Sequence, residues 1–412
     1  MQFNADLHIH GRFSTATSHD MNFKALARGA QQKGVHLLAT GDCLHPTWLA
    51  EIKEMEEVSE GTFQSGEIKF ILSTEVEGEK RVHHLIYFPA ISSVQQFSKA
   101  IEKKASNLSS DGRPNVYMNG EELAQLAVDA GAYVGPAHGF TPWTGMYAHF
   151  DSLKGCYGDM ASKIKFLELG LSADSNYADM IEELADITFI TNSDAHSPQP
   201  VRLAREFNVI EAKDMTYKEV ILALERKNGR RIILNVGLPP EEGKYNRTAC
   251  STCFRQYELG QALALRWRCV CHGIIKKGVR DRAIELGNGR KTVHPEHRPD
   301  YKYMIPLSEI LMRASGHSSP FTGGVRSQWE LLVKNFGNEI NVLLEAKPAE
   351  IEKIAGKEVS KAIQAFRDGK IKVVPGGGGK YGSVLLPWQV PKAEEAPKLS
   401  EKKKGQKTLF EY

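Results

Sequence analysis

The sequence has no long apolar segment and few cysteines for its length. Its mean hydropathy is −0.36, and no run approaches the ~20 apolar residues of a membrane-spanning helix, which argues against an integral membrane protein. Residues 1–6 lack the basic start and apolar stretch of a secretory signal, so we expect a cytoplasmic protein. Only six cysteines occur among 412 residues. Four of them fall between positions 250 and 271, which indicates a metal site and not a disulfide framework.

The charge of the chain is unevenly distributed, although the net charge is only +3. Residues 244–300 contain twelve Lys or Arg against five Asp or Glu. This excess predicts a polyanionic partner for the segment. A solvated basic face is the alternative.

Residues 1–237 show short apolar runs alternating with helical stretches, which is typical of β/α units. The candidate strands are 3–9, 35–40, 68–74, 84–88, 132–137, 164–169, 187–191 and 232–236. The candidate helices are 23–33, 120–130, 177–184 and 218–227. We therefore predict an α/β fold in which seven or eight units close into a distorted TIM-like barrel, with an open doubly wound sheet as the alternative.

Three further segments follow the predicted barrel domain, 1–237. A Pro- and Gly-rich stretch at 237–243 precedes a basic, cysteine-rich module at 244–305, and a helical region covers 306–388. The run Gly376-Gly377-Gly378-Gly379-Lys380 lacks the first glycine and the Ser or Thr of a phosphate-binding loop, so we predict a turn. Residues 389–412 are rich in Pro, Lys and Glu, which predicts a disordered tail.

Histidines and carboxylates recur at the ends of the predicted strands. His8 and His10 lie on one face of the first strand, where an HxH pair chelates a metal well. The other residues placed at strand ends are Asp42, His45, Glu75, His138, Asp194 and His196. His84 starts its run; we prefer it to the adjacent His83 as a ligand. Glu168 is placed equally well, but we leave it aside because it could bind a backbone group.

The strand ends of a β/α barrel converge on one rim, so these side chains are expected to form a metal centre. Imidazole and carboxylate without sulfur suit Zn²⁺, Mn²⁺ or Fe²⁺, and Mg²⁺ is a further alternative. This many ligands predicts a cluster of divalent ions that polarises a phosphoryl group, and hence phosphoester hydrolysis. We expect the catalytic residues to be His10, Glu75, His138 and Asp194.

This series of residues resembles the polymerase and histidinol phosphatase (PHP) superfamily over about residues 1–235. The resemblance implies up to three ions, with Glu75 bridging two of them. Around the first ion it places His8, His10 and Asp194; around the second, His84 and His138; around the third, His45 and His196. Two features depart from the superfamily pattern, since Thr15 replaces its usual aspartate and Asp42 is separated from His45. We therefore expect one to three ions.

Two close pairs, Cys250 with Cys253 and Cys269 with Cys271, predict a structural Zn²⁺ held between two turns. His272 is an alternative fourth ligand to Cys271. Basic residues interleave with Tyr257 and Trp267 in the same module, a composition suited to phosphate contact and base stacking. The residues that we expect to contact DNA are Arg266, Arg268, Lys276, Lys277 and Arg280.

The last seven residues resemble the peptide by which proteins bind a sliding clamp such as PCNA. Gln406, Leu409 and Tyr412 occupy its glutamine, aliphatic and aromatic positions. A tether that ends in apolar anchors suits a groove on a partner.

The order of barrel, basic zinc module, helical region and clamp-like tail resembles the archaeal-type endonuclease Q family along essentially the whole chain. The resemblance implies a metal-dependent, nucleoid-associated DNA-repair endonuclease of a prokaryotic cell. It would nick the phosphodiester 5′ of deaminated bases (hypoxanthine, uracil, xanthine) and of abasic sites. Two alternatives remain open: a phosphoesterase acting on a small phosphorylated metabolite, and a clamp-bound adaptor without catalysis.

Overall fold

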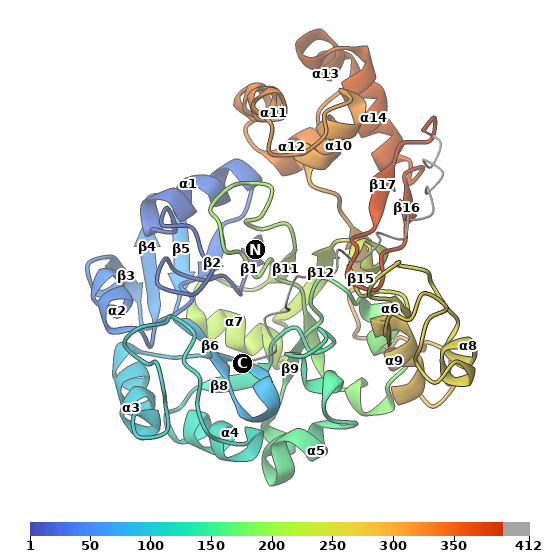
Figure 1. Ribbon diagram of the computed structural model, residues 1–412. Coiled ribbons are helices and arrows are strands. Elements are labelled where there is room, and N and C mark those ends of the chain that lie inside the picture. Colours follow the sequence, from blue (N-terminus) through green and yellow to red (C-terminus); the bar gives the residue numbers. More distant parts are fainter. Residues whose placement is uncertain (390–412) are drawn as a thin grey trace, which may run out of the picture.

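The computed structural model describes residues 1–389 and consists of a strand-rich body, a cysteine module and a helical C-terminal region (Figure 1). The tail and its predicted clamp-binding residues, Gln406, Leu409 and Tyr412, lie outside the described residues. Within residues 1–389, no helix is both long and apolar enough to cross a bilayer.

The largest sheet has eight strands in the order β15-β12-β11-β1-β2-β5-β4-β3. Their bounds are β1 (Gln2–Asp6), β2 (Leu37–Ala39), β3 (Glu56–Ser59), β4 (Thr62–Ser65), β5 (Ile68–Ile71), β11 (Phe207–Glu211), β12 (Arg231–Gly237) and β15 (Asp300–Tyr303). The first strand, β1, pairs in parallel with β2 and antiparallel with β11. It is therefore an interior strand of the sheet. The residues that follow it emerge where β1 ends, beside the end of its parallel neighbour β2.

Two smaller sheets complete the strand-rich body. One consists of β6 (Ser73–Glu77), β7 (His83–Tyr87) and β8 (Tyr133–Pro136), and the other of β9 (Phe166–Glu168) and β10 (Thr188–Ile190). The strands β8 and β9 are close, since a Cβ atom at Gly135 would come within 2.6 Å of the Phe166 carbonyl oxygen. The α/β class is as predicted. The hydrogen-bonded ladders form three sheets, however, and do not by themselves close into one barrel.

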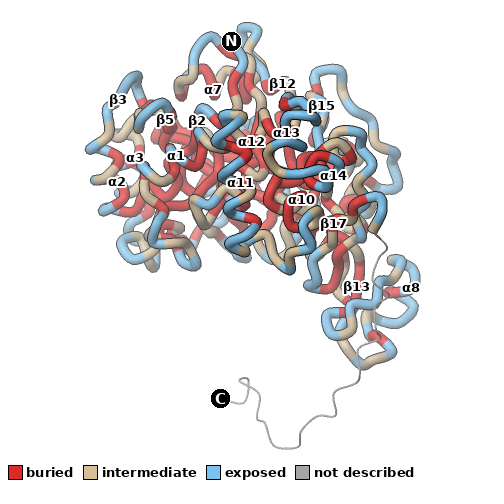
Figure 2. The backbone as a smooth tube through the Cα atoms, turned by 90° about the horizontal axis from the view of Figure 1, so that it is seen from above, coloured by how far each residue is buried: buried red, intermediate tan, exposed pale blue. Residues whose placement is uncertain are grey.

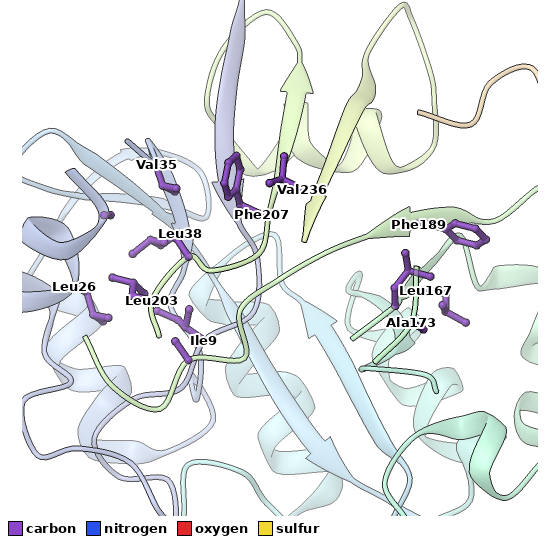
Figure 3. Close-up of a cluster of buried hydrophobic side chains, with 14 of the residues drawn as sticks. Ile9, Leu26, Val35, Leu38, Leu167, Ala173, Phe189, Leu203, Phe207 and Val236 are labelled. Atoms are coloured by element: carbon purple, nitrogen blue, oxygen red, sulfur yellow. The ribbon is translucent and has the colours of Figure 1, made fainter. Parts of the chain in front are cut away.

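Helices surround these strands. They are α1 (Phe23–Lys33), α2 (Pro46–Lys53), α3 (Ile91–Ile101), α4 (Gly120–Asp129), α5 (Leu153–Tyr157), α6 (Ser175–Ala178) and α7 (Tyr217–Leu224). The helix predicted at 23–33 has these bounds because the Asn22 side chain caps its first turn and Gly34, at φ 90°, ends it in the left-handed conformation. Its buried face includes Leu26, which Figure 3 shows with Ile9, Leu38 and Leu203.

The helical C-terminal region packs on the strand-rich body through α1. It comprises α10 (Leu307–Ala314), α11 (Gly323–Phe336), α12 (Glu339–Leu344), α13 (Pro348–Ala355) and α14 (Lys357–Arg367). The helices α1 and α12 are in contact, as Figure 2 also shows. Glu339 is buried there and binds Lys33 Nζ at 2.7 Å, Trp329 Nε1 at 2.6 Å and the Leu307 N–H at 3.1 Å. Trp329 and Leu307 hold the carboxylate within the C-terminal region, and its ion pair with Lys33 joins that region to the body.

The cysteine module contains β13 (Ala249–Cys250), α8 (Leu259–Ala264), β14 (Ile275–Lys276) and α9 (Val279–Leu286). Figure 2 shows β13 and α8 projecting from the body. The module was predicted to extend to residue 305, but β15 lies beside β12 in the largest sheet. Residues 300–303 therefore belong structurally to the strand-rich body.

A hairpin of β16 (Lys372–Val374) and β17 (Ser383–Leu385) connects the C-terminal region with the cysteine module. The glycine run at 376–379 forms its turn, as predicted. The Arg247 N–H donates to the Gly376 carbonyl at 3.0 Å. Gly378 has φ +65°, and a Cβ atom there would lie 2.2 Å from the Cys250 carbonyl oxygen. Only glycine allows this approach without a shift of the backbone.

Candidate metal centre

The metal centre is built where the segments that follow β1 and β10 run side by side. The Asp194 N–H donates to the His8 carbonyl and the His10 N–H to the Ala195 carbonyl, both at 3.0 Å. These bonds continue the parallel pairing beyond the strands. As a result, the HxH pair and the Asp194–His196 pair face each other although they are more than 180 residues apart.

Three overlapping groups of side chains could each hold a metal ion, with ligand atoms within 4.8 Å of one another. The groups are His8, His10 and Glu75; His10, Asp194 and His196; and Glu75, His83 and His138. His10 and Glu75 each belong to two groups. The geometry thus suits a cluster with shared ligands, and it brings together the four residues that the sequence indicated as catalytic.

Glu75 lies at the centre of these groups. Its Oε1 is 2.8 Å from His83 Nδ1 and 2.8 Å from His138 Nε2, and its Oε2 is 3.2 Å from Arg113. Burial opposes ionisation of Glu75, but His83 and His138 outweigh this effect and hold its pKa well below the usual range. The carboxylate is therefore charged and able to bind cations.

The Nδ1 atoms of both histidines of the HxH pair lie within hydrogen-bond distance of carboxylates. Glu168 lies 2.9 Å from His8 Nδ1, and Asp42 lies 3.0 Å from His10 Nδ1. His8 Nε2 is buried without a hydrogen-bond partner, 3.8 Å from Glu75 and 3.9 Å from Asp194. A buried imidazole nitrogen that is oriented by a carboxylate and aimed at other carboxylates fits a metal ligand. The residues present therefore suit a divalent ion.

Two residues that the sequence indicated as ligands orient other groups instead. Asp42 holds His10 and also accepts hydrogen bonds from the Gly11 N–H at 2.6 Å and Ser14 Oγ at 2.8 Å. His45 caps α2 by accepting a hydrogen bond from the Trp48 N–H at 3.4 Å. Neither residue belongs to any of the three groups.

The expectation for His84 is corrected, because His83 occupies the place assigned to it. Successive residues of a strand point to opposite faces, and β7 begins at His83, which turns toward Glu75. His84 Nδ1 lies 2.9 Å from the Tyr157 hydroxyl on the other face. Burial and the charge of His83 lower the pKa of His84 to about 3, so it stays neutral.

Substitution of each of these neighbouring histidines in turn tests which of the two is the metal ligand. We expect His83→Gln to lower the metal content of the purified protein, because it removes a ligand atom from the group around Glu75. His84→Gln should retain the metal content and lose only thermal stability, since it breaks a buried contact with Tyr157. Metal analysis and thermal melts of both variants check this. Equal metal loss in both variants, or loss in His84→Gln alone, would contradict the correction.

The backbone at three of the strand ends is unusual. Asp42, His138 and Asp194 have φ values of 47°, 29° and 48°, in the left-handed region that residues other than glycine rarely adopt. Strain of this kind persists where the surrounding structure fixes a functional side chain. Asp194 is further stabilised as a carboxylate, since the hydrogen bond from His10 and the charge of His8 outweigh burial and hold its pKa well below normal.

Metal binding should depend on pH because His8 must lose a proton. Burial opposes its protonation, but Glu168, Glu75 and Asp194 outweigh burial and raise the pKa of His8 to about 9 in the metal-free protein. A metal ligand must be unprotonated, so the affinity for Mn²⁺ should rise from pH 6 to pH 9 and binding should release protons. Calorimetric titration in buffers of different ionisation enthalpy checks this. An affinity that does not change over this range would contradict it.

The four cysteines of the module also converge. Cys250 Sγ lies 3.5 Å from Cys271 Sγ, and Cys253 Sγ lies 3.5 Å from Cys269 Sγ. All four sulfur atoms lie within 4.8 Å of one another. His272 is not part of this group, so the geometry favours Cys271 as the fourth ligand. Four thiol groups at these separations form a candidate metal site with the ligand set of a structural zinc site.

The basic residues predicted to contact DNA lie around this site. Arg266 and Arg268 are exposed beside the cysteines. Lys276 and Arg280 are half-buried, and Lys277 binds Glu285 at 2.7 Å. Arg113 also contacts the metal centre, since it reaches Glu75. It was not predicted from the sequence, because it lies in a loop without a periodic pattern.

A family model and two curated proteins match the sequence of this chain. Residues 306–370 match the family model of the MJ0043 C-terminal domain. The chain is 46% identical over 251 residues to the uncharacterized protein MJ0043 of Methanocaldococcus jannaschii; this covers 60% of the chain but only 31% of that protein, so the chain spans about a third of its length. It is 30% identical over 407 residues to the uncharacterized protein YqxK of Bacillus subtilis, covering 92% of the chain and 98% of YqxK.

Two solved structures match nearly the whole chain with a TM-score of 0.89 and 45% identity. One is the lesion-specific endonuclease PfuEndoQ of Pyrococcus furiosus, with 96% of this chain and 98% of that chain covered. The other is endonuclease Q with a 27-mer duplex substrate that carries an abasic lesion at the active site, with 96% and 99% covered. At this identity and coverage, the chain belongs to the endonuclease Q family.

Proposed function

We propose that this protein is a metal-dependent DNA-repair endonuclease that nicks the phosphodiester 5′ of deaminated bases and of abasic sites. The observation that carries the proposal is the cluster of three ligand groups that share His10 and Glu75. Relatives with the same fold are a lesion-specific endonuclease and an endonuclease Q bound to abasic DNA. Hypoxanthine, uracil and xanthine are the deaminated bases that we expect as substrates.

Divalent ions held at these groups would polarise the scissile phosphate and stabilise the developing charge on its oxygens. His8, His83 and His138 would supply nitrogen ligands, while Glu75 and Asp194 would supply carboxylate oxygens. Glu168 and Asp42 keep the histidine rings oriented. Arg113 lies beside Glu75 with a quarter of its side chain exposed, and its guanidinium is suited to bind a phosphate oxygen.

We expect the cysteine module to bind DNA and the tail to bind a protein partner. One Zn²⁺ on the four cysteines would stabilise the module, and the arginines and lysines around it would contact the DNA backbone. The barrel arrangement expected from the sequence would place all the metal ligands on one rim. Gln406, Leu409 and Tyr412 would bind a sliding clamp, and the protein would act at the nucleoid of a prokaryotic cell.

The test is cleavage of a labelled duplex that carries one deoxyinosine, deoxyuridine or abasic site, beside its undamaged twin, with Mg²⁺ or Mn²⁺ supplied. We expect a single nick 5′ of the lesion and none in the undamaged duplex. Turnover of a small phosphomonoester without cleavage of any duplex would instead establish a metabolite phosphatase. Clamp binding without hydrolysis of either substrate would establish an adaptor.

A further inference from the structure

Ser193, the residue before Asp194, is held by two side chains that were not predicted from the sequence as parts of the site. Asp6 is buried at the end of β1, where it accepts hydrogen bonds from the Ser193 N–H at 3.1 Å and from Ser193 Oγ at 2.5 Å. Arg205 donates two hydrogen bonds, from Nε and Nη2, to the Ser193 carbonyl oxygen, both at 3.2 Å. Every polar group of Ser193 therefore has a partner within the protein.

The Ser193 carbonyl belongs to the same planar peptide group as the Asp194 N–H. This group is held at both ends, because its carbonyl accepts from Arg205 and its N–H donates to the His8 carbonyl at 3.0 Å. The orientation of the group about Asp194 is the angle φ of that residue, which is 48°. A positive φ is uncommon for residues other than glycine and persists only where the surroundings fix it. Arg205 and His8 provide such contacts.

The bond from the Asp194 N–H to the His8 carbonyl keeps the Asp194 carboxylate beside the HxH pair. Its Oδ1 lies 3.1 Å from His10 Nε2 and 3.9 Å from His8 Nε2. A turn of the peptide group would break the bond to His8 and shift the carboxylate relative to both rings. Arg205 opposes this turn, because its two donors converge on the carbonyl at the other end of the peptide group.

The backbone next to Arg205 is attached to the same point. Asp6 accepts a further hydrogen bond from the Ala204 N–H at 3.1 Å, so one carboxylate joins the residue before Arg205 to Ser193. Leu203 is buried among apolar side chains of the body (Figure 3). The Arg205 guanidinium thus reaches Ser193 from a backbone that is itself fixed.

The charge of Arg205 lies within electrostatic range of the metal centre and of the C-terminal region. Burial lowers the pKa of Arg205, while Glu206 and Asp194 oppose this effect. Burial raises the pKa of Glu309 in α10, and Arg205 opposes that rise. A positive charge this close to Asp194 would by itself repel a metal ion. Its presence there is explained if the arginine has a role that outweighs the repulsion.

We propose that Arg205 is a positioning residue of the metal centre, which orients Asp194 through the Ser193 carbonyl and thereby raises the affinity for a divalent ion. Arginine suits this role because its planar guanidinium offers several donors in a fixed geometry. In this role it touches neither the ion nor the substrate. The inference rests on the proposed function, because it takes Asp194 as a metal ligand.

The experiment measures the affinity of the full chain for Mn²⁺ by calorimetric titration, with one Zn²⁺ per chain retained in the cysteine module. Arg205→Gln is compared with Arg205→Lys, which keeps the charge but cannot present two fixed donors. Arg226→Gln is the matched control, because Arg226 is also half-buried and donates to a backbone carbonyl, that of Asp186, at 2.8 Å. This contact precedes β10, whereas Asp194 follows it. Thermal melts and duplex binding are measured on the same samples.

We expect Arg205→Gln to bind Mn²⁺ about 10- to 100-fold more weakly, the usual range for loss of a group that orients a metal ligand. Arg205→Lys should show a smaller loss, and Arg226→Gln should keep the native affinity. Nicking by Arg205→Gln should still rise at Mn²⁺ concentrations that saturate the native chain, while its affinity for a lesion duplex stays nearly native. In the Asp194→Asn background, Arg205→Gln should have little further effect on Mn²⁺ affinity.

Unchanged Mn²⁺ affinity in Arg205→Gln with a lower melting temperature would show a merely structural role and overturn the inference. A higher affinity would also overturn it, since that result is expected if the arginine only repels the ion. Weaker duplex binding at native Mn²⁺ affinity would show a substrate contact instead. If Arg205→Gln does not fold, Arg205→Lys replaces it, and native Mn²⁺ affinity in that variant would refute the positioning role.

Failure of the native chain to bind Mn²⁺ or to nick any lesion duplex is a different result. It would refute the proposed function itself, and it is read from the native chain before any Arg205 variant is made.

Discussion

The Asp194→Asn variant should bind a lesion-bearing duplex normally and fail to nick it. Asp194 contributes an oxygen to the group with His10 and His196, and its Oδ1 lies 3.1 Å from His10 Nε2. Loss of a group that only orients a metal ligand costs about 10- to 100-fold in activity or metal affinity, so loss of a ligand should cost at least about 100-fold. Asparagine tolerates the left-handed backbone at this position, φ 48°, so the fold should be retained.

Single-turnover nicking and fluorescence anisotropy with the same duplex measure the two properties separately. Asp129→Asn is a matched control, because Asp129 is an exposed carboxylate at the end of α4. It should retain both binding and nicking. Full activity in Asp194→Asn would exclude this carboxylate as a metal ligand.

The second large effect is expected from Cys250→Ser. The module's own apolar core is small; its buried members are Cys250, Ala262, Cys269 and Ile275. Two of these four are proposed metal ligands, so removal of one should release the ion and unfold the module. Zinc binding contributes about 10–16 kcal/mol in zinc-finger peptides, more than such a core supplies. We expect loss of one zinc per chain, rapid proteolysis between residues 244 and 299, and weaker DNA binding.

Metal analysis, limited proteolysis and anisotropy measure these three losses. Cys156→Ala is the control, because Cys156 is buried outside the cluster and burial raises its pKa to about 12, which disfavours the thiolate form that binds metals. Zinc content, protease resistance and DNA affinity that are all unchanged in Cys250→Ser would refute the zinc module.

Much of the candidate site could be predicted from the sequence, because its side chains follow buried strands. The apolar runs before His8, His138 and Asp194 are recognisable as strands, and the ends of such strands come together in space. Glu75 was placed at the end of a strand predicted over 68–74, whereas it lies inside β6. The cysteines are close in sequence, and their spacing predicts a shared site directly. The α1 helix has the predicted bounds because its cap residues occur at both ends.

Other features depend on contacts that leave no local pattern. The choice between His83 and His84 depends on the residue at which β7 begins, and a shift of one residue reverses the face of both side chains. The β3–β4 hairpin and β11 were not predicted, since polar residues interrupt the apolar ones in all three strands and leave no continuous apolar run. Pairing of β15 with β12 joins segments separated by the entire cysteine module, and no local signal predicts it.

The close approach of Gly378 to Cys250 has a consequence for the cooperativity of unfolding. The hairpin turn and the cysteine module share backbone hydrogen bonds, from the Arg247 N–H to Gly376 and from the Gly379 N–H to Lys244. Amides of residues 372–385 should therefore exchange with deuterium at the same rate as those of the module, as one unit that opens together. A chelator that removes the metal would then also release the hairpin, which begins at Lys372, far along the chain from the cysteines. The β16–β17 hairpin would in this way report whether the cysteine site holds its ion.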